Sequence, residues 1–294
     1  MNATASRKMD RIENPGLIEL IQKLGAGGYE RVFLAEGDSW FDIFTPAPLH
    51  QPNLLDAIRT PWNAAVVDIS HVGDTAKEMA TSPQAPHTLT LLNTFKFHAL
   101  LLSAGGNDLK NAFKEAYLKL LVHRESKSSA ALPDDIATMT SNPAAATATF
   151  DEVCGYIVSW IGLRDLSKLN RDTPVILHGY DYLQPRPAGA RVWMGGPTAS
   201  GPWIHPVLDA AGKTDSEMRA IARTVIDTFN EKLRTRVAHL SKVHLLDTRE
   251  TLVLAEPKNK GPSNDWMDEI HPAPEGFTKL AHKAWGPTIA SVAR

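Results

Sequence analysis

The chain has little of what marks several large protein classes. One cysteine, Cys154, occurs among 294 residues, which excludes an intramolecular disulfide and a zinc site built from several cysteines. Cys154 lies in an apolar stretch, and this favours a buried, unreactive thiol. The formal net charge of -2 and the lack of a Lys/Arg cluster make nucleic acid an unexpected partner.

Long apolar runs are also missing. No window approaches the roughly 18 apolar residues that a membrane-spanning helix needs, and residues 1–16 lack the apolar centre of a signal peptide. We therefore expect a cytoplasmic protein without stable membrane insertion. The histidines do not follow HExxH or another metal-binding spacing, so we expect no metal and no other cofactor.

Short apolar runs that end in small or polar residues recur along the chain and predict buried parallel strands. They are Val32 to Ala35, Ala64 to Ile69, Ala99 to Ser103, Pro174 to His178 and Val243 to Asp247. Helical patterns cover residues 16–24, 109–122, 150–169, 214–233 and 274–293. Strands that alternate with helices predict one α/β domain over residues 1–294, with a parallel sheet between two helical layers.

Two segments fit no regular element. Residues 126–149 are rich in Ala, Ser and Thr, and we expect a mobile insertion or lid there. Residues 180–206 are dense in proline and glycine but also carry tyrosine and tryptophan, which predicts an ordered loop over the sheet edge.

Polar residues follow three of the predicted strands at the point where each strand ends. Gly37-Asp38-Ser39 offers a hydroxyl, Gly73 offers a backbone amide, and Gly105-Gly106-Asn107 offers a side-chain amide. Ligands of open parallel sheets bind beyond the carboxyl ends of the strands. Each block alone is also an ordinary turn or helix-cap sequence, so no single block decides the function.

A fourth block, Asp268-Glu-Ile-His271-Pro272, precedes the last predicted helix. A carboxylate three residues before a histidine can accept from one ring nitrogen and leave the other free to take a proton from a hydroxyl. Asp265, six residues before His271, is the alternative acid. A surface loop with a capping Asp is the non-catalytic interpretation.

Together and in this order, the four blocks resemble those of the SGNH (GDSL-like) hydrolase superfamily. The resemblance extends from Arg31 to about Phe277, although its specific part is a few short blocks. It implies a three-layer α/β/α flavodoxin-like sandwich with a five-stranded parallel sheet. It also implies that Ser39 is the nucleophile, His271 the general base and Asp268 its partner. Gly73 and Asn107, with the Ser39 amide, would form the oxyanion hole.

The pattern as a whole predicts a carboxylesterase- or lipase-like serine hydrolase that acts on a small-molecule ester. We expect Trp40, His178 and Trp203 to contact the substrate. The alternative for His178 is a hydrogen-bonded structural histidine, and the alternative for Trp203 is core packing. A thioesterase or acyltransferase using the same serine, or a non-catalytic binding module on this fold, are the other interpretations. The sequence specifies neither the ester nor the oligomeric state.

Overall fold

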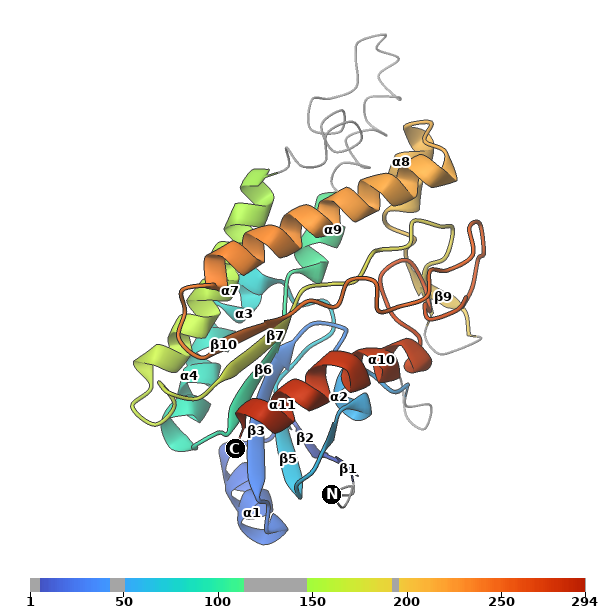
Figure 1. Cartoon of the computed structure of the whole chain (residues 1–294). Helices are drawn as coiled ribbons and strands as arrows, with labels where there is room; N and C mark the ends of the chain where they lie inside the picture. The colour runs from blue at the N-terminus through green and yellow to red at the C-terminus, as the bar shows by residue number, and fades with distance from the viewer. Residues whose placement is uncertain (1–5, 43–50, 114–146, 192–195, 294) are drawn as a thin grey trace.

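A parallel six-stranded sheet forms the middle layer of the molecule (Figure 1). The structure is a computed structural model that describes residues 6–42, 51–113, 147–191 and 196–293. The strand order is β10-β7-β6-β3-β5-β2, and every neighbouring pair is parallel. The strands are β2 (Asp10–Glu13), β3 (Arg31–Gly37), β5 (Ala64–Asp68), β6 (Ala99–Ser103), β7 (Val175–His178) and β10 (Val243–Leu246).

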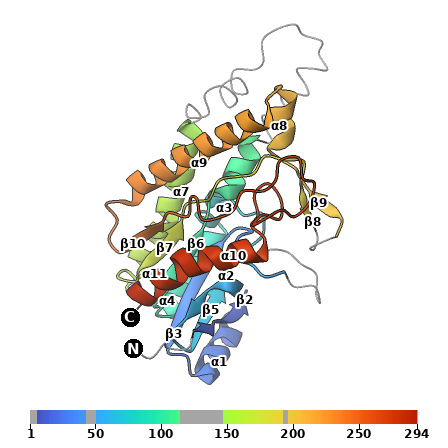
Figure 2. The same ribbon diagram turned by 45° about the vertical axis from the view of Figure 1, so that its right-hand side comes forward.

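Helices cover both faces of this sheet, which gives the three-layer α/β/α architecture that the sequence predicts. Helices α3, α4, α7 and α9 pack together on one face, and α2, α10, η2 and α11 lie together on the other (Figures 1 and 2). The helices are α1 (Leu17–Gly27), α2 (Leu54–Ala57), α3 (Ala76–Met79), α4 (Gln84–Thr94), α7 (Thr147–Leu166), α8 (His205–Ala210), α9 (Asp215–Val237), α10 (Pro274–Leu280), the π-helical η2 (Ala281–Trp285) and α11 (Gly286–Val292).

The predicted count of five strands is wrong by one, because β2 adds a sixth beside β5. In β2 only Ile12 is buried; an edge strand with one covered side chain gives no apolar run for a sequence pattern to detect. The five predicted strands follow the flavodoxin-like order 2-1-3-4-5. The topological switch point, where the strand order reverses, lies between β3 and β6. These are the strands that precede Ser39 and Asn107.

The two segments expected to be irregular have different outcomes. Residues 147–149 belong to α7, and the rest of the 126–149 segment lies outside the described residues. Within 180–206, β8 (Ala190–Arg191) and β9 (Thr198–Ser200) form a short antiparallel pair. The expectation of no regular element there is therefore wrong for this pair.

Gly37 lies at the end of β3, closely packed against Phe41 and against Ser103 of β6. A Cβ atom at this position would lie 2.8 Å from Phe41 Cδ2 and 3.0 Å from Ser103 Cβ, closer than real side chains approach. Only glycine therefore fits between β3 and β6 here. Beyond it, the amides of Phe41 and Asp42 both donate to the Asp38 carbonyl, so Ser39 lies within a tight turn.

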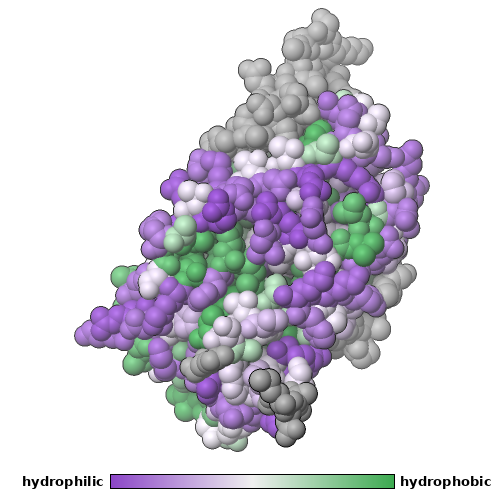
Figure 3. Space-filling view, in the orientation of Figure 1, coloured by the Kyte–Doolittle hydropathy of each residue, from purple (hydrophilic) through white to green (hydrophobic). Residues whose placement is uncertain are grey.

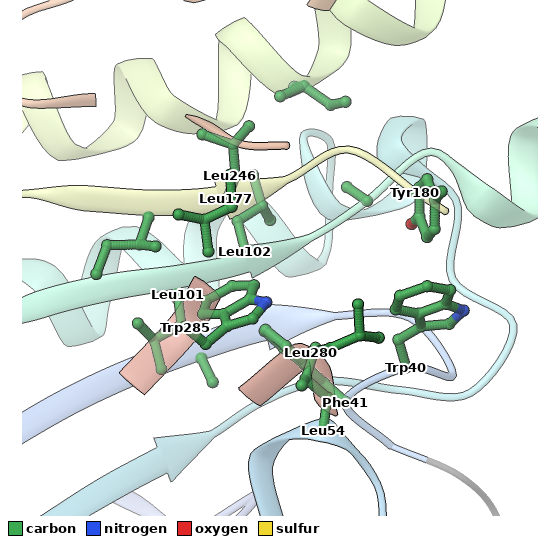
Figure 4. Packing of buried hydrophobic residues seen from close by; sticks show 14 of the residues in the cluster. Trp40, Phe41, Leu54, Leu101, Leu102, Leu177, Tyr180, Leu246, Leu280 and Trp285 are labelled. Atoms are coloured by element: carbon green, nitrogen blue, oxygen red, sulfur yellow. The ribbon is translucent and has the colours of Figure 1, made fainter. Parts of the chain in front are cut away.

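Aromatic side chains fill the core between the sheet and the C-terminal helices (Figure 4). Trp40 packs edge-on against Phe277, with ring centroids 5.9 Å apart, and Phe41 packs against Trp285 at 5.3 Å. Such tilted pairs add to the free energy gained by burying their apolar area. Cys154 is fully buried, as expected, and burial raises the pKa of its thiol to about 11.

The outer surface contrasts with this core. The face seen in Figure 3 is mostly hydrophilic, with separate apolar patches. Among the residues that the structure describes, no helix combines the length and apolar character needed to cross a bilayer.

His178, at the end of β7, belongs to the aromatic core. Its ring centroid lies 5.0 Å from that of Trp40 and 5.4 Å from that of Trp285, and its exposure is 1%. Its Nε2 lies 3.0 Å from Ser103 Oγ. Burial lowers the pKa of His178 to about 3, so the ring is neutral throughout the neutral pH range.

This burial predicts a loss of stability in mild acid. Below pH about 6.5 the histidine of the unfolded chain takes up a proton that the folded chain does not bind, which favours unfolding. His178→Gln should remove roughly 1.4 kcal/mol per pH unit from the slope of the unfolding free energy between pH 6 and 5. Urea unfolding at several pH values measures this slope. The exposed His87→Gln variant is the control, and equal slopes in wild type and His178→Gln would contradict the assignment.

Candidate active site

Ser39, His271 and Asp268 form a hydrogen-bonded chain at the carboxyl edge of the sheet. His271 Nε2 lies 2.8 Å from Ser39 Oγ, and His271 Nδ1 lies 2.8 Å from Asp268 Oδ2. Asp268 is 1% exposed, and its second oxygen accepts from the backbone amide of His271 at 2.9 Å. The carboxylate therefore fixes a proton on Nδ1, so that Nε2 faces the serine as an acceptor.

The structure also separates the two candidate acids of the C-terminal block. The side chain of Asp265 is engaged away from the imidazole: it accepts from Lys279 Nζ at 2.7 and 2.6 Å and from the Val253 amide at 2.6 Å. Asp265 thus ties the block to α10 and to the preceding loop. Asp268 is the acid that contacts His271.

Gly73 and Asn107 lie beside Ser39 in the lining of one cavity. The Asn107 amide donates one hydrogen to the Asp74 carbonyl at 3.0 Å, and its oxygen accepts from Lys110 Nζ at 2.5 Å. These two bonds fix which way the side-chain amide points. Its second N–H is the donor that a negatively charged oxygen near Ser39 would need.

Under the serine lies a buried polar network that no sequence pattern predicts. Asp38 accepts from Tyr180 Oη at 2.5 Å, from Ser103 Oγ at 2.8 Å and from the Trp40 amide at 3.0 Å. Burial raises the pKa of Asp38, and these three donors oppose that rise. Three donors from three parts of the chain fix the turn that presents Ser39.

Glu269, next to the acid of the C-terminal block, is a second residue that sequence reasoning missed. Its buried carboxylate accepts from three consecutive backbone amides, those of Trp203, Ile204 (2.9 Å) and His205 (2.6 Å). Burial raises the pKa of Glu269 to about 7, against the effect of these amides. The carboxylate holds the 203–205 segment against the C-terminal block.

Arg186 stabilises the same block through backbone carbonyls. Its guanidinium donates to the carbonyls of Asn259 at 3.0 Å, Asp268 at 3.2 Å and Trp266 at 3.4 Å, and also to that of Gly261. The side chain is 1% exposed. The guanidinium donates hydrogen bonds to these loop carbonyls. In a buried loop, such bonds replace the ones that water would otherwise donate.

A cavity of about 270 Å³ opens above Ser39. Trp203, one of the expected substrate contacts, lines it and lies 6.1 Å from the His271 ring. Lys110 Nζ lies 5.6 Å from the centre of the Trp203 ring. The lining includes Ser39, Gly73, Asn107, Lys110, Arg191, Trp203 and His271.

The other two expected substrate contacts do not line this cavity. His178 is buried in the aromatic core, so its assignment to the substrate pocket is wrong. Trp40 is 3% exposed and donates to the Ile270 carbonyl at 3.1 Å; it borders only a small neighbouring recess. Both residues follow a strand at the active edge, and sequence alone cannot tell which of such side chains turn inward.

Comparisons with known proteins show which solved structures resemble this fold. No protein-family model matches the chain, and no curated protein matches it either. A lipase from a goat rumen metagenome matches with a TM-score of 0.50 at 13% identity, covering 90% of this chain and 99% of that one. An extracellular lipase from Streptomyces rimosus (TM-score 0.49, 17% identity) and an aryl esterase from M. smegmatis (0.49, 12%) each cover 89% of this chain and 99% of theirs. At such identity the likeness concerns the backbone, and the chain has the fold of the goat rumen lipase.

Proposed function

We propose that this chain is a serine hydrolase of the SGNH kind, which cleaves carboxylic esters through an acyl-enzyme on Ser39. One observation carries the proposal: a single imidazole lies 2.8 Å from a serine hydroxyl and 2.8 Å from a buried carboxylate. A serine beside a base that a third group orients is the arrangement expected of an activated nucleophile. The cavity above the serine gives a substrate access to it.

In the proposed reaction, His271 Nε2 takes the proton of Ser39 Oγ as the oxygen attacks the ester carbonyl. The tetrahedral oxyanion is stabilised by the second N–H of Asn107 and the amides of Ser39 and Gly73. His271 then returns the proton to the leaving alcohol, and Asp268 stabilises the imidazolium between these steps. A water molecule, activated by the same imidazole, releases the acid and restores Ser39.

The dimensions and chemistry of the cavity favour a small-molecule ester. Pockets for drug-sized ligands measure about 300–1,000 Å³, and this one, at about 270 Å³, lies just below that range. Its lining combines one large aromatic ring, Trp203, with two cations, Lys110 and Arg191. Because the cavity is small, a compact ester suits it better than one with a long acyl chain. The cytoplasmic location expected from the sequence stays a prediction.

Replacement of the serine tests the proposal directly. Wild-type protein should hydrolyse p-nitrophenyl esters, with short acyl chains preferred because the cavity is small. Ser39→Ala should lower kcat by at least about 10³-fold, since residual rates come only from binding and the oxyanion donors. The exposed Ser291→Ala, on α11, is a serine control that should retain activity. Turnover that survives in Ser39→Ala would contradict the proposal, and absence of turnover in wild type would favour a specialised acyl donor or a binding function.

The two aspartates of the C-terminal block provide a matched pair for the second test. Asp268→Asn keeps the shape of the side chain but lets His271 adopt the wrong tautomer, so kcat should fall by about 10³–10⁴-fold. Asp265→Asn removes the charge that pairs with Lys279 and one of the two acceptor oxygens, so it should lower the melting temperature with a smaller effect on kcat. Steady-state kinetics and thermal unfolding of both variants measure the contrast. The reverse ranking of the two kcat values would make Asp265 the acid.

A further inference from the structure

Behind the loop that carries Gly73 lies a group of side chains outside the proposed chemistry. Glu36 comes from the end of β3, and His71 and Asp74 come from the loop after β5. Their oxygen and nitrogen atoms all lie within 4.8 Å of one another. None of the three lines the cavity above Ser39, so the group is separate from the proposed active site.

Glu36 is the unusual member of this group. It is 1% exposed, its Oε2 accepts a long bond of 3.3 Å from Thr88 Oγ1, and its Oε1 has no hydrogen-bond partner among the described residues. The carboxylates of Asp74 and Asp68 are close to it and are also negative. A buried carboxylate with so few donors is costly to ionise, so a cation bound beside it would stabilise its charged form.

One distance within the group matches the spacing of metal ligands. Zinc bonds to imidazole and carboxylate ligands measure about 2.0–2.2 Å, which places two ligands of a tetrahedron about 3.4 Å apart. His71 Nδ1 and Asp74 Oδ2 are 3.4 Å apart. Asp74 Oδ2 also accepts from Gln84 Nε2 at 2.7 Å. A carboxylate oxygen of Glu36 lies within 4.8 Å of the other two ligand atoms, and its unpartnered Oε1 is the candidate third ligand. His71 is half exposed, with 51% of its side chain accessible, so an ion could enter from solvent.

We propose that Glu36, His71 and Asp74 bind a divalent first-row cation, Zn²⁺ or Mn²⁺. One imidazole and two carboxylates form a mixed nitrogen and oxygen set, which suits these ions better than Ca²⁺, whose sites use six to eight oxygens. The sequence predicts no metal because its histidines follow no known metal-binding spacing, and Glu36 lies on β3, far in sequence from His71 and Asp74. The parallel pairing of β3 with β5 brings them together.

The position of the ion gives it a structural role next to the oxyanion donors. His71 and Asp74 flank Gly73, which has a φ of 95° and lines the cavity. The carbonyl of Asp74 also accepts from the Asn107 amide. A cation bound to both flanking side chains would close residues 71–74 into a ring and restrict the movement of Gly73 and Asn107. It would act as a positioning ion that does not touch the substrate.

Direct binding of the metal alone tests the site. Full-length protein is freed of metal with EDTA, and Zn²⁺ and Mn²⁺ are titrated by calorimetry. We expect one saturable site per chain and, at a hundredfold excess over Kd, a melting temperature raised by about 5 °C. Ca²⁺ should bind much more weakly. This measurement needs no turnover, so its failure would leave ester hydrolysis untouched.

Variants locate the site. Glu36→Gln should abolish saturable binding, and His71→Ala should weaken it at least about tenfold, whereas the exposed His87→Ala should bind as wild type does. If Glu36→Gln fails to fold, His71→Ala on the half-exposed ligand decides alone. No saturable binding to wild type would show that Glu36 holds a proton instead and would overturn the proposal. Equal affinity in wild type and His71→Ala would overturn it as well.

Discussion

The contact between His271 and Ser39 joins residues 232 positions apart in the chain, and much of the surrounding structure holds it in place. On one side, the turn after β3 is fixed by the donors to Asp38. On the other, the loop before α10 is fixed by Arg186 and by Glu269. A hydrogen bond between the two side chains is short only while both loops stay rigid, because an error of one ångström at either end would break it.

The two loops are also joined directly. Trp40, the residue after the serine, donates its indole N–H to the carbonyl of Ile270, the residue before the histidine. The indole ring packs between Tyr180 and Phe277, so the aromatic core reaches the residues next to the site. Because protein cores are closely packed, a change in this core would shift the site. We infer that the aromatic core under Ser39 contributes to activity as well as to stability.

Some features were predictable from sequence because they depend on local patterns. Buried parallel strands such as β5 and β6 are continuous apolar runs, and the blocks that follow them lie at one edge whatever the strand order. Other features depend on contacts between distant residues. The edge strand β2 has only one buried side chain. Glu269 accepts hydrogen bonds from backbone amides of residues 203–205. Glu36 lies near His71 because β3 pairs with β5. No residue spacing in the sequence predicts these contacts.

The central claim is that Ser39 is a nucleophile activated by His271. Labelling with a fluorophosphonate, followed by mass spectrometry of the digested protein, tests it without knowledge of the natural ester. The account predicts one adduct per chain, located on Ser39, and labelling slowed by orders of magnitude in His271→Ala. An adduct on another serine, or equal labelling of Ser39 without the imidazole, would contradict it.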